Sequence, residues 1–383
     1  MSAKEDELTP LAKEVAAAVL PDADQAAELF PVTVNDSPAT PDEHAAAMET
    51  LAFGETFGDY MAVAEWSKDK GWHDRRVEPF GPLQLSPAAS VLHYSQEIFE
   101  GMKAFRWEDD SIWTFRPAFN AARLNNSARR MAMPEIDLDD FVGALVQLVR
   151  EDSRWVPGVE NSSLYLRPFM FADEPFVGIR PAHHYKFIVI GSPVGPYFKG
   201  GLSPVSIWVA TDHNRAAPGG TGAAKTGGNY AASLLPQQLA AEKGFEQVCY
   251  LDPKTGKNLE ELGGMNVFVV KQDGTVLTPK LSGSILEGGT RTAILQLLND
   301  HDVAVEETTI PLEWLVEAIK TGEVTEMFAC GTAAIVTPIG RFAGEGFDVT
   351  LPEQKLTHQI FDELSGIQRG LLPDRHGWMY RLA

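Results

Sequence analysis

A glycine-rich segment with a single lysine is the feature that most narrows what this chain can fold into. Residues 216–230 read Ala-Ala-Pro-Gly-Gly-Thr-Gly-Ala-Ala-Lys-Thr-Gly-Gly-Asn-Tyr. A run typical of a strand, 205–211, precedes it and a pattern typical of a helix, 229–243, follows it, so the sequence predicts a strand, a turn and a helix of an α/β fold. Lys225 has small neighbours, which leave room for a flat ligand and reduce its hydration. These surroundings favour the neutral amine that Schiff-base chemistry requires.

A nucleotide-binding loop is an alternative interpretation of the same segment. Residues Gly219–Thr226 differ from the phosphate-binding pattern G-x-x-x-x-G-K-[ST] in Ala224, which replaces the second glycine. The apolar run 248–251 ends in Asp252 and could be the magnesium-binding strand of such a protein. The Ala224 side chain would crowd a turn whose backbone N–H groups surround phosphate, so this interpretation is the less favoured one.

Acidity and low cysteine content argue against several functional classes. The chain has 53 Asp and Glu against 32 Lys and Arg, a formal net charge of −21, which opposes binding to nucleic acids. No signal peptide or membrane-length run is recognisable, so we expect a cytoplasmic protein without a membrane partner. Cys249 and Cys330 lie in separate apolar stretches, which predicts no disulfide. The nine histidines are scattered, which predicts no metal site.

At 383 residues the chain is long enough for two hydrophobic cores. Residues 1–39, rich in Ala, Asp, Glu and Pro, predict a flexible acidic arm, and Thr40 and Glu43 predict a capping box where a helix begins. Paired glycines and a proline predict a linker at 199–204 between a small domain, 40–198, and a large domain, 205–383. Further strands are expected at 60–66, 164–171, 185–190, 247–251 and 266–271, and further helices at 95–102, 117–131, 137–149, 290–299 and 311–321.

The segment from Lys225 to Tyr230, Lys-Thr-Gly-Gly-Asn-Tyr, resembles the cofactor-lysine segment of the branched-chain aminotransferases, which are pyridoxal 5'-phosphate (PLP) enzymes of fold type IV. The resemblance covers about residues 50–383. It is supported by further motifs in the family's order: Phe53-Gly54, Leu92–Ser95 with Phe99–Ala104, Tyr165–Pro168, Glu261–Asn266 and Gly331–Ala334. It implies two α/β domains (α+β), a cofactor in the cleft between them, and a homodimer.

The resemblance implies a role in cofactor binding for several residues. Lys225 is expected to bind the cofactor covalently and, once the substrate amine has displaced it, to carry a proton between substrate and cofactor. Glu261 is expected to keep the pyridine nitrogen protonated, while Glu260 faces solvent. Tyr230 is expected to hydrogen-bond the phenolic oxygen, although taken alone it could be a core aromatic residue. The groups expected to bind the phosphate are Arg123, the backbone of Gly289 and Thr290, and Thr332.

For the substrate, the resemblance implies an apolar pocket with a polar end. The residues expected to line the pocket are Phe53, Tyr94, Phe99, Tyr165 and Tyr197. The α-carboxylate is expected to contact Tyr94, Arg167 and the backbone of Thr332 and Ala333. Ile179 is expected to reach the pocket of a neighbouring subunit.

Two departures from the family stand out. Gly264 replaces a threonine that contacts the substrate side in mammalian relatives, so the polar end of the pocket is expected to differ. Ala334 and Thr337 replace a mammalian cysteine pair, so no thiol switch is expected.

The activity implied is transamination of leucine, isoleucine and valine with 2-oxoglutarate, which yields branched-chain 2-oxo acids and glutamate. D-amino acid transaminases and aminodeoxychorismate lyases share the fold, the lysine and the phosphate site. Tyr94, Tyr165 and Arg167 together favour the branched-chain substrates. One methylene changes binding in an apolar pocket by only about 1–3 kcal/mol, so the sequence ranks neither the three substrates nor the two directions of the reaction.

Overall fold

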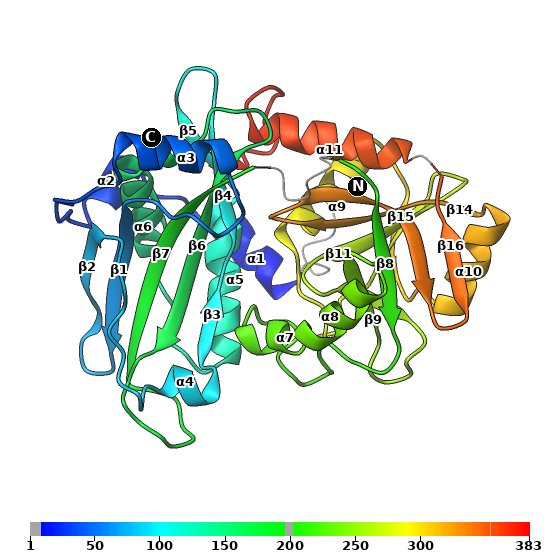
Figure 1. Cartoon of the computed structure of the whole chain (residues 1–383), viewed down its shortest axis with the longest axis horizontal. Helices are drawn as coiled ribbons and strands as arrows, with labels where there is room; N and C mark the ends of the chain where they lie inside the picture. The colour runs from blue at the N-terminus through cyan, green and yellow to red at the C-terminus, as the bar shows by residue number, and fades with distance from the viewer. Residues whose placement is uncertain (1–8, 196–201, 353) are drawn as a thin grey trace. The chain divides into compact units, whose positions relative to one another are not determined.

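The computed structural model describes residues 9–195, 202–352 and 354–383, and the chain divides into two compact units (Figure 1). Unit 1 comprises Met1–Tyr197, Ala224–Thr226 and Ile367–Ala383, and unit 2 comprises Phe198–Ala223 and Gly227–Gly366. The division falls close to the expected linker, of which 199–201 lie outside the described residues. It differs from the expected domains in placing the segment around Lys225 and the stretch from Ile367 onwards in unit 1.

Unit 1 is built on an antiparallel sheet. Its described strands are β1 (Tyr60–Ser67), β2 (Gly71–Pro79), β3 (Glu97–Phe99), β4 (Met102–Arg106), β5 (Ile112–Phe115), β6 (Ser163–Ala172), β7 (His184–Val194) and β17 (Met379–Arg381). They are ordered β17-β5-β4-β6-β7-β1-β2, and β3 pairs with β6 beside that path. Met379 of β17 pairs with Phe115 and Arg381 pairs with Trp113. This pairing explains why the stretch from Ile367 belongs to unit 1.

The helices of unit 1 begin where local signals place them. Their bounds are α1 (Pro10–Ala17), α2 (Ala23–Ala27), α3 (Pro41–Thr50), α4 (Ser90–Tyr94), α5 (Pro117–Arg130) and α6 (Leu138–Glu151), with a 3-10 turn at Ser153–Trp155. The predicted capping box is confirmed: the Thr40 N–H donates to the Glu43 carboxylate at 2.8 Å, and the Glu43 N–H donates to the Thr40 hydroxyl at 3.3 Å. The apolar stripe of α6 is buried in the unit 1 core with side chains of β1 and β7. Each aliphatic side chain buried there contributes about 1.5–3 kcal/mol.

The prediction of a helix at 95–102 is wrong. After α4 the backbone of Ser95 is left-handed, with φ 48°, and the chain continues as β3 and then β4. Ile98 of β3 pairs with Met170 of β6 and is fully buried. Pairing with a strand distant in the sequence overrides the local helical pattern.

The segment before residue 40, expected to be a flexible arm, is packed onto unit 1 over its described part. Phe30 is 1% exposed and belongs to the unit 1 core together with Ala26 of α2. Gly143 of α6 permits this packing, because a Cβ there would lie 2.3 Å from the Ala26 carbonyl oxygen. The segment is rich in acidic residues and prolines, but a few small and aromatic side chains supply its burial.

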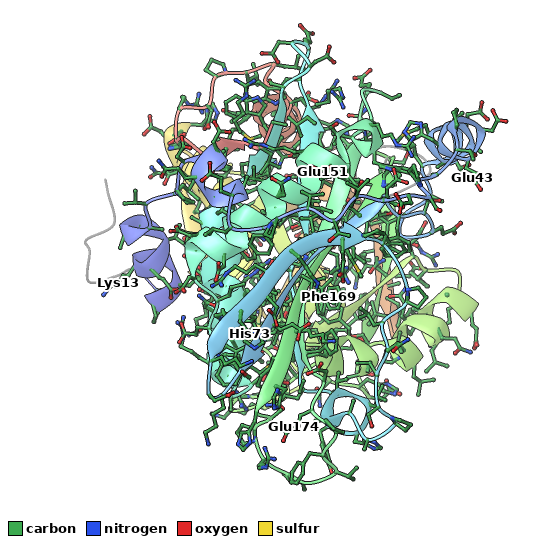
Figure 2. The ribbon with its side chains drawn as sticks, turned by 90° about the vertical axis from the view of Figure 1, so that its left-hand side faces the viewer. Lys13, Glu43, His73, Glu151, Phe169 and Glu174 are labelled. Carbon is green, nitrogen blue, oxygen red and sulfur yellow. The ribbon has the colours of Figure 1, made fainter. Side chains whose placement is uncertain are left out.

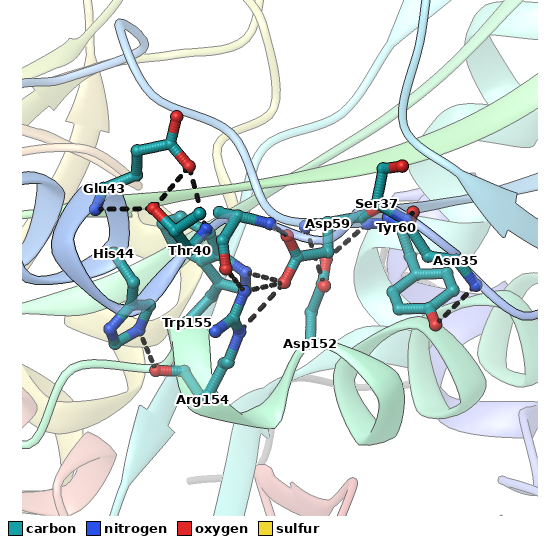
Figure 3. A network of polar contacts seen from close by, with 11 residues as sticks. Asn35, Ser37, Thr40, Glu43, His44, Asp59, Tyr60, Asp152, Arg154 and Trp155 are labelled. Carbon is teal, nitrogen blue, oxygen red and sulfur yellow. Dashed lines mark hydrogen bonds and ion pairs between the residues drawn. The ribbon is translucent and has the colours of Figure 1, made fainter.

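Two buried carboxylates hold this segment near the start of β1 (Figure 3). The Asp59 carboxylate accepts hydrogen bonds from the Arg154 guanidinium and the Trp155 indole, both at 2.7 Å, and from the Ala39 N–H at 2.8 Å. Asp152 is fully buried and accepts from the Asp59 N–H at 2.9 Å. Burial raises the pKa of Asp152 to about 8, although hydrogen bonds from backbone N–H groups oppose the shift.

Replacement Asp152→Asn is expected to flatten the pH dependence of stability. The folded-state pKa of Asp152 is about 8 and lies above its ordinary value of 3.8, so the folded state retains a proton that the unfolded chain releases. The resulting stabilisation is complete below about pH 4 and is lost as the pH rises through 8. The free energy of unfolding of the variant should therefore fall less steeply between about pH 5 and pH 8, by on the order of 1 kcal/mol per pH unit.

Urea denaturation across this pH range measures the effect, and Asp42→Asn, an exposed aspartate of α3, is the matched control. Equal slopes for Asp152→Asn and the unsubstituted protein would contradict the assignment.

Unit 2 is built on a mixed sheet. Its described strands are β8 (Val205–Ala210), β9 (Gln247–Leu251), β10 (Leu259–Leu262), β11 (Asn266–Lys271), β12 (Val276–Pro279), β13 (Val305–Thr308), β14 (Val324–Gly331), β15 (Ile335–Gly344) and β16 (Phe347–Thr350). They are ordered β10-β9-β8-β15-β14-β11-β12-β13, and β16 pairs with β15. β8 is parallel to both β9 and β15, and β12 is parallel to β13, while the other pairs are antiparallel. The combination of helices with these sheets confirms the α+β class.

The helices of unit 2 are α7 (Gly227–Ala231), α8 (Leu234–Glu242), α9 (Gly289–Asp300), α10 (Leu312–Thr321) and α11 (Lys355–Gln368), the last of which ends in unit 1. The single helix predicted over 229–243 is interrupted at Ala232 and Ser233. Pro236 has no N–H to donate to the Ala232 carbonyl, and its ring would clash with that carbonyl in a continuous helix. None of the described helices has the length and hydrophobicity needed to cross a bilayer.

Candidate active site

Hydrogen bonds to unit 1 elements fix the backbone of Lys225. Its N–H donates to the Ser127 hydroxyl of α5 at 2.9 Å, and its carbonyl accepts from the Phe99 N–H of β3 at 3.0 Å. The next residue, Thr226, donates its hydroxyl to the Glu97 carbonyl at 2.8 Å. These contacts explain why Ala224–Thr226 groups with unit 1 although the residues on both sides belong to unit 2.

The side chain of Lys225 lies over an aromatic ring that it shares with an arginine. The Lys225 amine is 4.6 Å from the centre of the Phe99 ring, and the Arg167 guanidinium is 4.7 Å from the same centre. An aromatic face attracts a cation, and two cations around one ring create a positive local potential. This part of unit 1 is therefore suited to a ligand with negative charge.

Arg123 of α5 is held by a carboxylate that the sequence did not single out. Its guanidinium donates from Nε and Nη2 to the two oxygens of Glu100, each at 2.7 Å. Glu100 is 0% exposed and also accepts from the Asn120 amide at 2.8 Å. A bidentate pair of this kind fixes the plane of the guanidinium. Glu100 thus orients the arginine expected to bind phosphate.

The expected substrate residues of unit 1 form two groups. Tyr165 and Arg167 alternate along β6 and so face the same side of the sheet, and Arg167 Nη2 donates to the Tyr165 hydroxyl at 3.1 Å. The Phe53 ring packs against Tyr165 with 4.9 Å between ring centres. A Cβ on Gly101 would lie 2.2 Å from the Tyr165 hydroxyl, so a larger residue there would displace the Tyr165 side chain. These residues therefore lie near Phe99, because the Arg167 guanidinium lies over the Phe99 ring.

Tyr94 and Ile179 form the second group and are exposed. Tyr94 ends α4 and is 40% exposed, and Ile179 is 94% exposed in the loop after β6. Tyr197, the remaining expected pocket residue, lies outside the described residues.

Glu261 of unit 2 is a buried carboxylate with several partners. It is 4% exposed, forms an ion pair with Arg215, and accepts from the Leu286 N–H at 3.1 Å and from the Asn266 amide at 3.3 Å. Burial raises its pKa to about 7, and the Arg215 guanidinium limits the shift.

Arg215, which sequence reasoning missed, is itself buried and ties Glu261 to two loops. It also donates to the carbonyls of Gly222 and Ser284, at 3.0 and 2.9 Å. Gly222 lies so close to Ser284 that a Cβ on it would be 2.3 Å from the Ser284 carbonyl oxygen. The glycine-rich loop thus requires a glycine at this position.

The expectation that Glu260 faces solvent is wrong. Glu260 is 7% exposed and accepts hydrogen bonds from the hydroxyls of Ser284, at 2.6 Å, and Ser282, at 3.2 Å. Burial raises its pKa, and these two hydroxyls oppose the shift. Both carboxylates of the motif are therefore inside unit 2, with Arg215 bound to Glu261.

Tyr230 lies beside Gly264. Tyr230 is half-buried in α7, and a Cβ on Gly264 would lie 3.7 Å from its ring. A larger residue at position 264 would therefore contact the tyrosine, and glycine leaves this space open.

The residues of unit 2 expected near phosphate occupy a helix start and a tight turn. Gly289 and Thr290 open α9, whose N-cap residue Gly288 provides no side-chain hydrogen bond. A Cβ on Gly288 would lie 2.1 Å from Asn266 Oδ1, so a larger N-cap residue would displace the Asn266 side chain. Thr332 and Ala333 lie in the turn between β14 and β15.

Comparison with known proteins identifies the family. Residues 97–342 match the model of the family described as amino-transferase class IV. The chain belongs to this family. The class IV aminotransferase is 48% identical over 360 residues to the branched-chain-amino-acid aminotransferase of Mycolicibacterium smegmatis, with 92% of this chain and 98% of that protein covered. It is 44% identical over 336 residues to branched-chain-amino-acid aminotransferase 2 of Bacillus subtilis, with coverages of 87% and 92%.

Solved structures share the fold of this aminotransferase. The branched-chain amino acid aminotransferase of Escherichia coli gives a TM-score of 0.71 at 26% identity, and the match covers 85% of this chain and 99% of that chain. The PLP-form of the branched-chain amino acid aminotransferase of Thermobaculum terrenum gives a TM-score of 0.67 at 21% identity, with coverages of 85% and 98%.

The family assignment and the structure bear on two other kinds of site, a nucleotide-binding loop and a metal site. The nucleotide-binding interpretation is wrong, because the chain is an aminotransferase and the Lys225 N–H, which would face phosphate in such a loop, donates to Ser127 instead. Within the part of the chain that the structure describes, no group of three or more His, Cys, Asp or Glu side chains is arranged to hold a metal ion.

Proposed function

We propose that this aminotransferase uses PLP, bound through Lys225, to exchange amino groups between leucine, isoleucine or valine and 2-oxoglutarate. One observation carries the proposal: Lys225 is held through both its N–H and its carbonyl, and its amine and the Arg167 guanidinium lie over the same Phe99 ring. The names of relatives that are 44–48% identical support the choice of substrates.

The residues of both units fit a flat, anionic cofactor. Gly289 and Thr290 open α9, and the N-terminal end of a helix carries a partial positive charge, so these residues suit a phosphate. The guanidinium of Arg123 in unit 1 and the hydroxyl of Thr332 in unit 2 are further donors whose chemistry suits phosphate. Glu261 is a buried carboxylate whose charged form would be favoured by a protonated pyridine nitrogen, and Tyr230 would bind the phenolic oxygen.

Lys225 performs the proton transfer in this proposal. PLP, when bound, supplies an electron sink for the negative charge that develops at the substrate α-carbon. The Lys225 amine would remove the α-proton from the substrate and deliver a proton to the cofactor carbon that carries the amino nitrogen, and it must be uncharged to accept the α-proton. Contact with the Phe99 ring restricts where the long lysine side chain can reach.

The two half-reactions require a pocket that accepts both an apolar side chain and one that ends in a carboxylate. The packed rings of Phe53 and Tyr165 provide apolar surface for the first. Arg167 serves the second: its Nε is buried without a hydrogen-bond partner among the described residues, and such a donor is costly until an acceptor arrives.

Absorption and product assays test the proposed function. Protein incubated with PLP should show a visible absorption band that changes when L-leucine is added, and borohydride reduction should leave a pyridoxyl group on Lys225. L-leucine with 2-oxoglutarate should yield glutamate, whereas D-leucine should not. A protein that takes up no cofactor, or that reacts with D-leucine instead, would contradict the proposal.

We further propose that the enzyme is a cytoplasmic homodimer that associates through an apolar face of unit 1. This face consists of Leu92, Tyr94, Val177 and Ile179, which are all exposed. An ion pair restrains the loop that carries Val177 and Ile179: Arg180 donates to Glu174 at 2.8 and 3.1 Å, near the end of the sheet where Figure 2 labels Glu174. Large apolar side chains on a restrained loop suit burial by a second copy. The unpaired thiols of Cys249 and Cys330 fit the reducing cytoplasm.

Replacement Ile179→Glu is expected to weaken the dimer at least ~10-fold, because it removes about 1.5–3 kcal/mol of apolar burial and places a charge in the interface. Val159→Glu, in another loop of unit 1 where valine is 64% exposed, is the matched control and should have no effect. Sedimentation equilibrium gives the dissociation constants. A monomeric unsubstituted protein, or equal weakening by both variants, would rule out this face.

A further inference from the structure

The Ser127 hydroxyl connects the cofactor lysine to the expected phosphate arginine. Ser127 lies one helical turn after Arg123 in α5 and is 0% exposed. Its hydroxyl donates to the Arg123 carbonyl at 3.0 Å and accepts from the Lys225 N–H at 2.9 Å. A serine within a helix often donates to the carbonyl four residues earlier. Here the oxygen also serves as the acceptor for a backbone N–H from another segment.

A second route joins the same two residues. The Lys225 carbonyl accepts from the Phe99 N–H at 3.0 Å, and Glu100, the next residue, holds the Arg123 guanidinium at 2.7 Å. The contacts therefore form a closed ring through Lys225, Ser127, Arg123, Glu100 and Phe99. Every member of this ring belongs to unit 1.

We infer that Ser127 is a positioning residue for the transamination step, because it fixes the backbone from which the Lys225 amine reaches the reacting atoms. The inference rests on the proposed function. It assigns Ser127 a role that acts through the backbone of Lys225, whose N–H donates to the Ser127 hydroxyl.

The physical argument starts from the flexibility of lysine. A lysine side chain has many rotamers, so a fixed backbone is needed to confine its amine to one region. The Phe99 hydrogen bond fixes the carbonyl side of Lys225, and Ser127 fixes the N–H side. Without the serine oxygen, the N–H would lose this acceptor in a partly buried site and the segment would shift to satisfy it. A small displacement of a catalytic group costs rate while it leaves substrate binding largely intact.

Replacement Ser127→Ala tests the inference. It removes the acceptor with little change in volume, and kcat should fall about 10-fold or more while KM for L-leucine and for 2-oxoglutarate changes less than about threefold. The visible band of the bound cofactor should titrate at a different pH, because the surroundings of the Lys225 nitrogen change. Thr114→Val is the matched control: Thr114 is also 0% exposed, and its hydroxyl donates to the Lys103 carbonyl at 2.9 Å without touching Lys225. Its kcat and its titration should match those of the unsubstituted enzyme.

Two outcomes would overturn the inference. One is a Ser127→Ala enzyme whose kcat and titration equal those of Thr114→Val. The other comes from the unsubstituted holoenzyme and stands even if the variant fails to fold: the Lys225 amide hydrogen should exchange slowly with solvent, as measured by mass spectrometry with electron-transfer fragmentation, and rapid exchange would contradict the serine hydrogen bond. If borohydride leaves no pyridoxyl group on Lys225 of the unsubstituted protein, the proposed function fails instead.

Discussion

Replacement Lys225→Ala is expected to lower kcat for transamination by at least ~10⁴-fold, because it removes both the amine that binds the cofactor and the base that moves the α-proton. Lys225→Arg should be as inactive as Lys225→Ala. It retains a cation near Phe99, but a guanidinium does not lose its proton in a protein and cannot act as the base. The two variants together separate the role of charge from the role of the amine. Steady-state assays with L-leucine and 2-oxoglutarate give the rates.

The matched control for Lys225 is Lys243→Ala. The Lys243 amine also lies over an aromatic ring, 3.8 Å from the centre of Trp208, but the side chain is 45% exposed and belongs to the surface of unit 2. Its removal should leave kcat within about twofold of the unsubstituted enzyme, as expected of an exposed cation. Substantial activity in Lys225→Ala, with a pyridoxyl group found on another lysine, would refute the assignment.

Replacement Glu100→Gln is expected to lower the free energy of unfolding by about 3–5 kcal/mol, because it leaves the buried Arg123 guanidinium without its counter-charge. Glu100 is fully buried, so no solvent compensates for the loss. The exposed pair of Arg129 and Glu135, at 2.6 Å, is the matched comparison, and Glu135→Gln should cost less than about 1 kcal/mol. Urea denaturation of the cofactor-free proteins measures both changes.

A double variant distinguishes stability from function at this ion pair. Glu100→Gln with Arg123→Met removes both charges and should recover part of the stability lost in Glu100→Gln alone. It should nevertheless bind PLP more weakly than the unsubstituted enzyme, because the expected phosphate arginine is gone. Equal unfolding free energies for Glu100→Gln and Glu135→Gln would show that the buried pair contributes no more than an exposed one.

Sequence patterns predicted the elements whose signals are local. Thr40 and Glu43 specify the start of α3 with their own side chains, and the strands β9 and β11 have the predicted bounds. The errors arose where a distant segment or a single residue decides the structure. β3 exists because β6 pairs with it, and the helix over 229–243 is divided because Pro236 interrupts its hydrogen bonds.

The same distinction holds for the site residues. Those identified by neighbouring sequence were predicted, and those whose roles depend on distant partners were not. The glycine-rich segment identified Lys225 from its immediate neighbours, and motifs near known family positions identified Arg123 and Glu261. Ser127 and Arg215 were missed because their roles depend on partners far away in the sequence. By its local sequence Ser127 is an ordinary serine within a helix. Its role depends on the hydrogen bond from the N–H of Lys225, 98 residues later in the sequence. Arg215 lies in the loop after β8 and gains its role from Glu261 of β10.

Segments of unit 1 lie both before and after unit 2 in the sequence, and this order affects folding during synthesis on the ribosome. β17 supplies an edge of the unit 1 sheet by pairing with β5, yet it is translated after all the strands of unit 2. A nascent chain that has completed unit 2 still exposes the backbone of β5 along this edge. An open strand edge is a template for pairing with other chains, so newly made molecules should be most prone to aggregate until residues 379–381 have emerged.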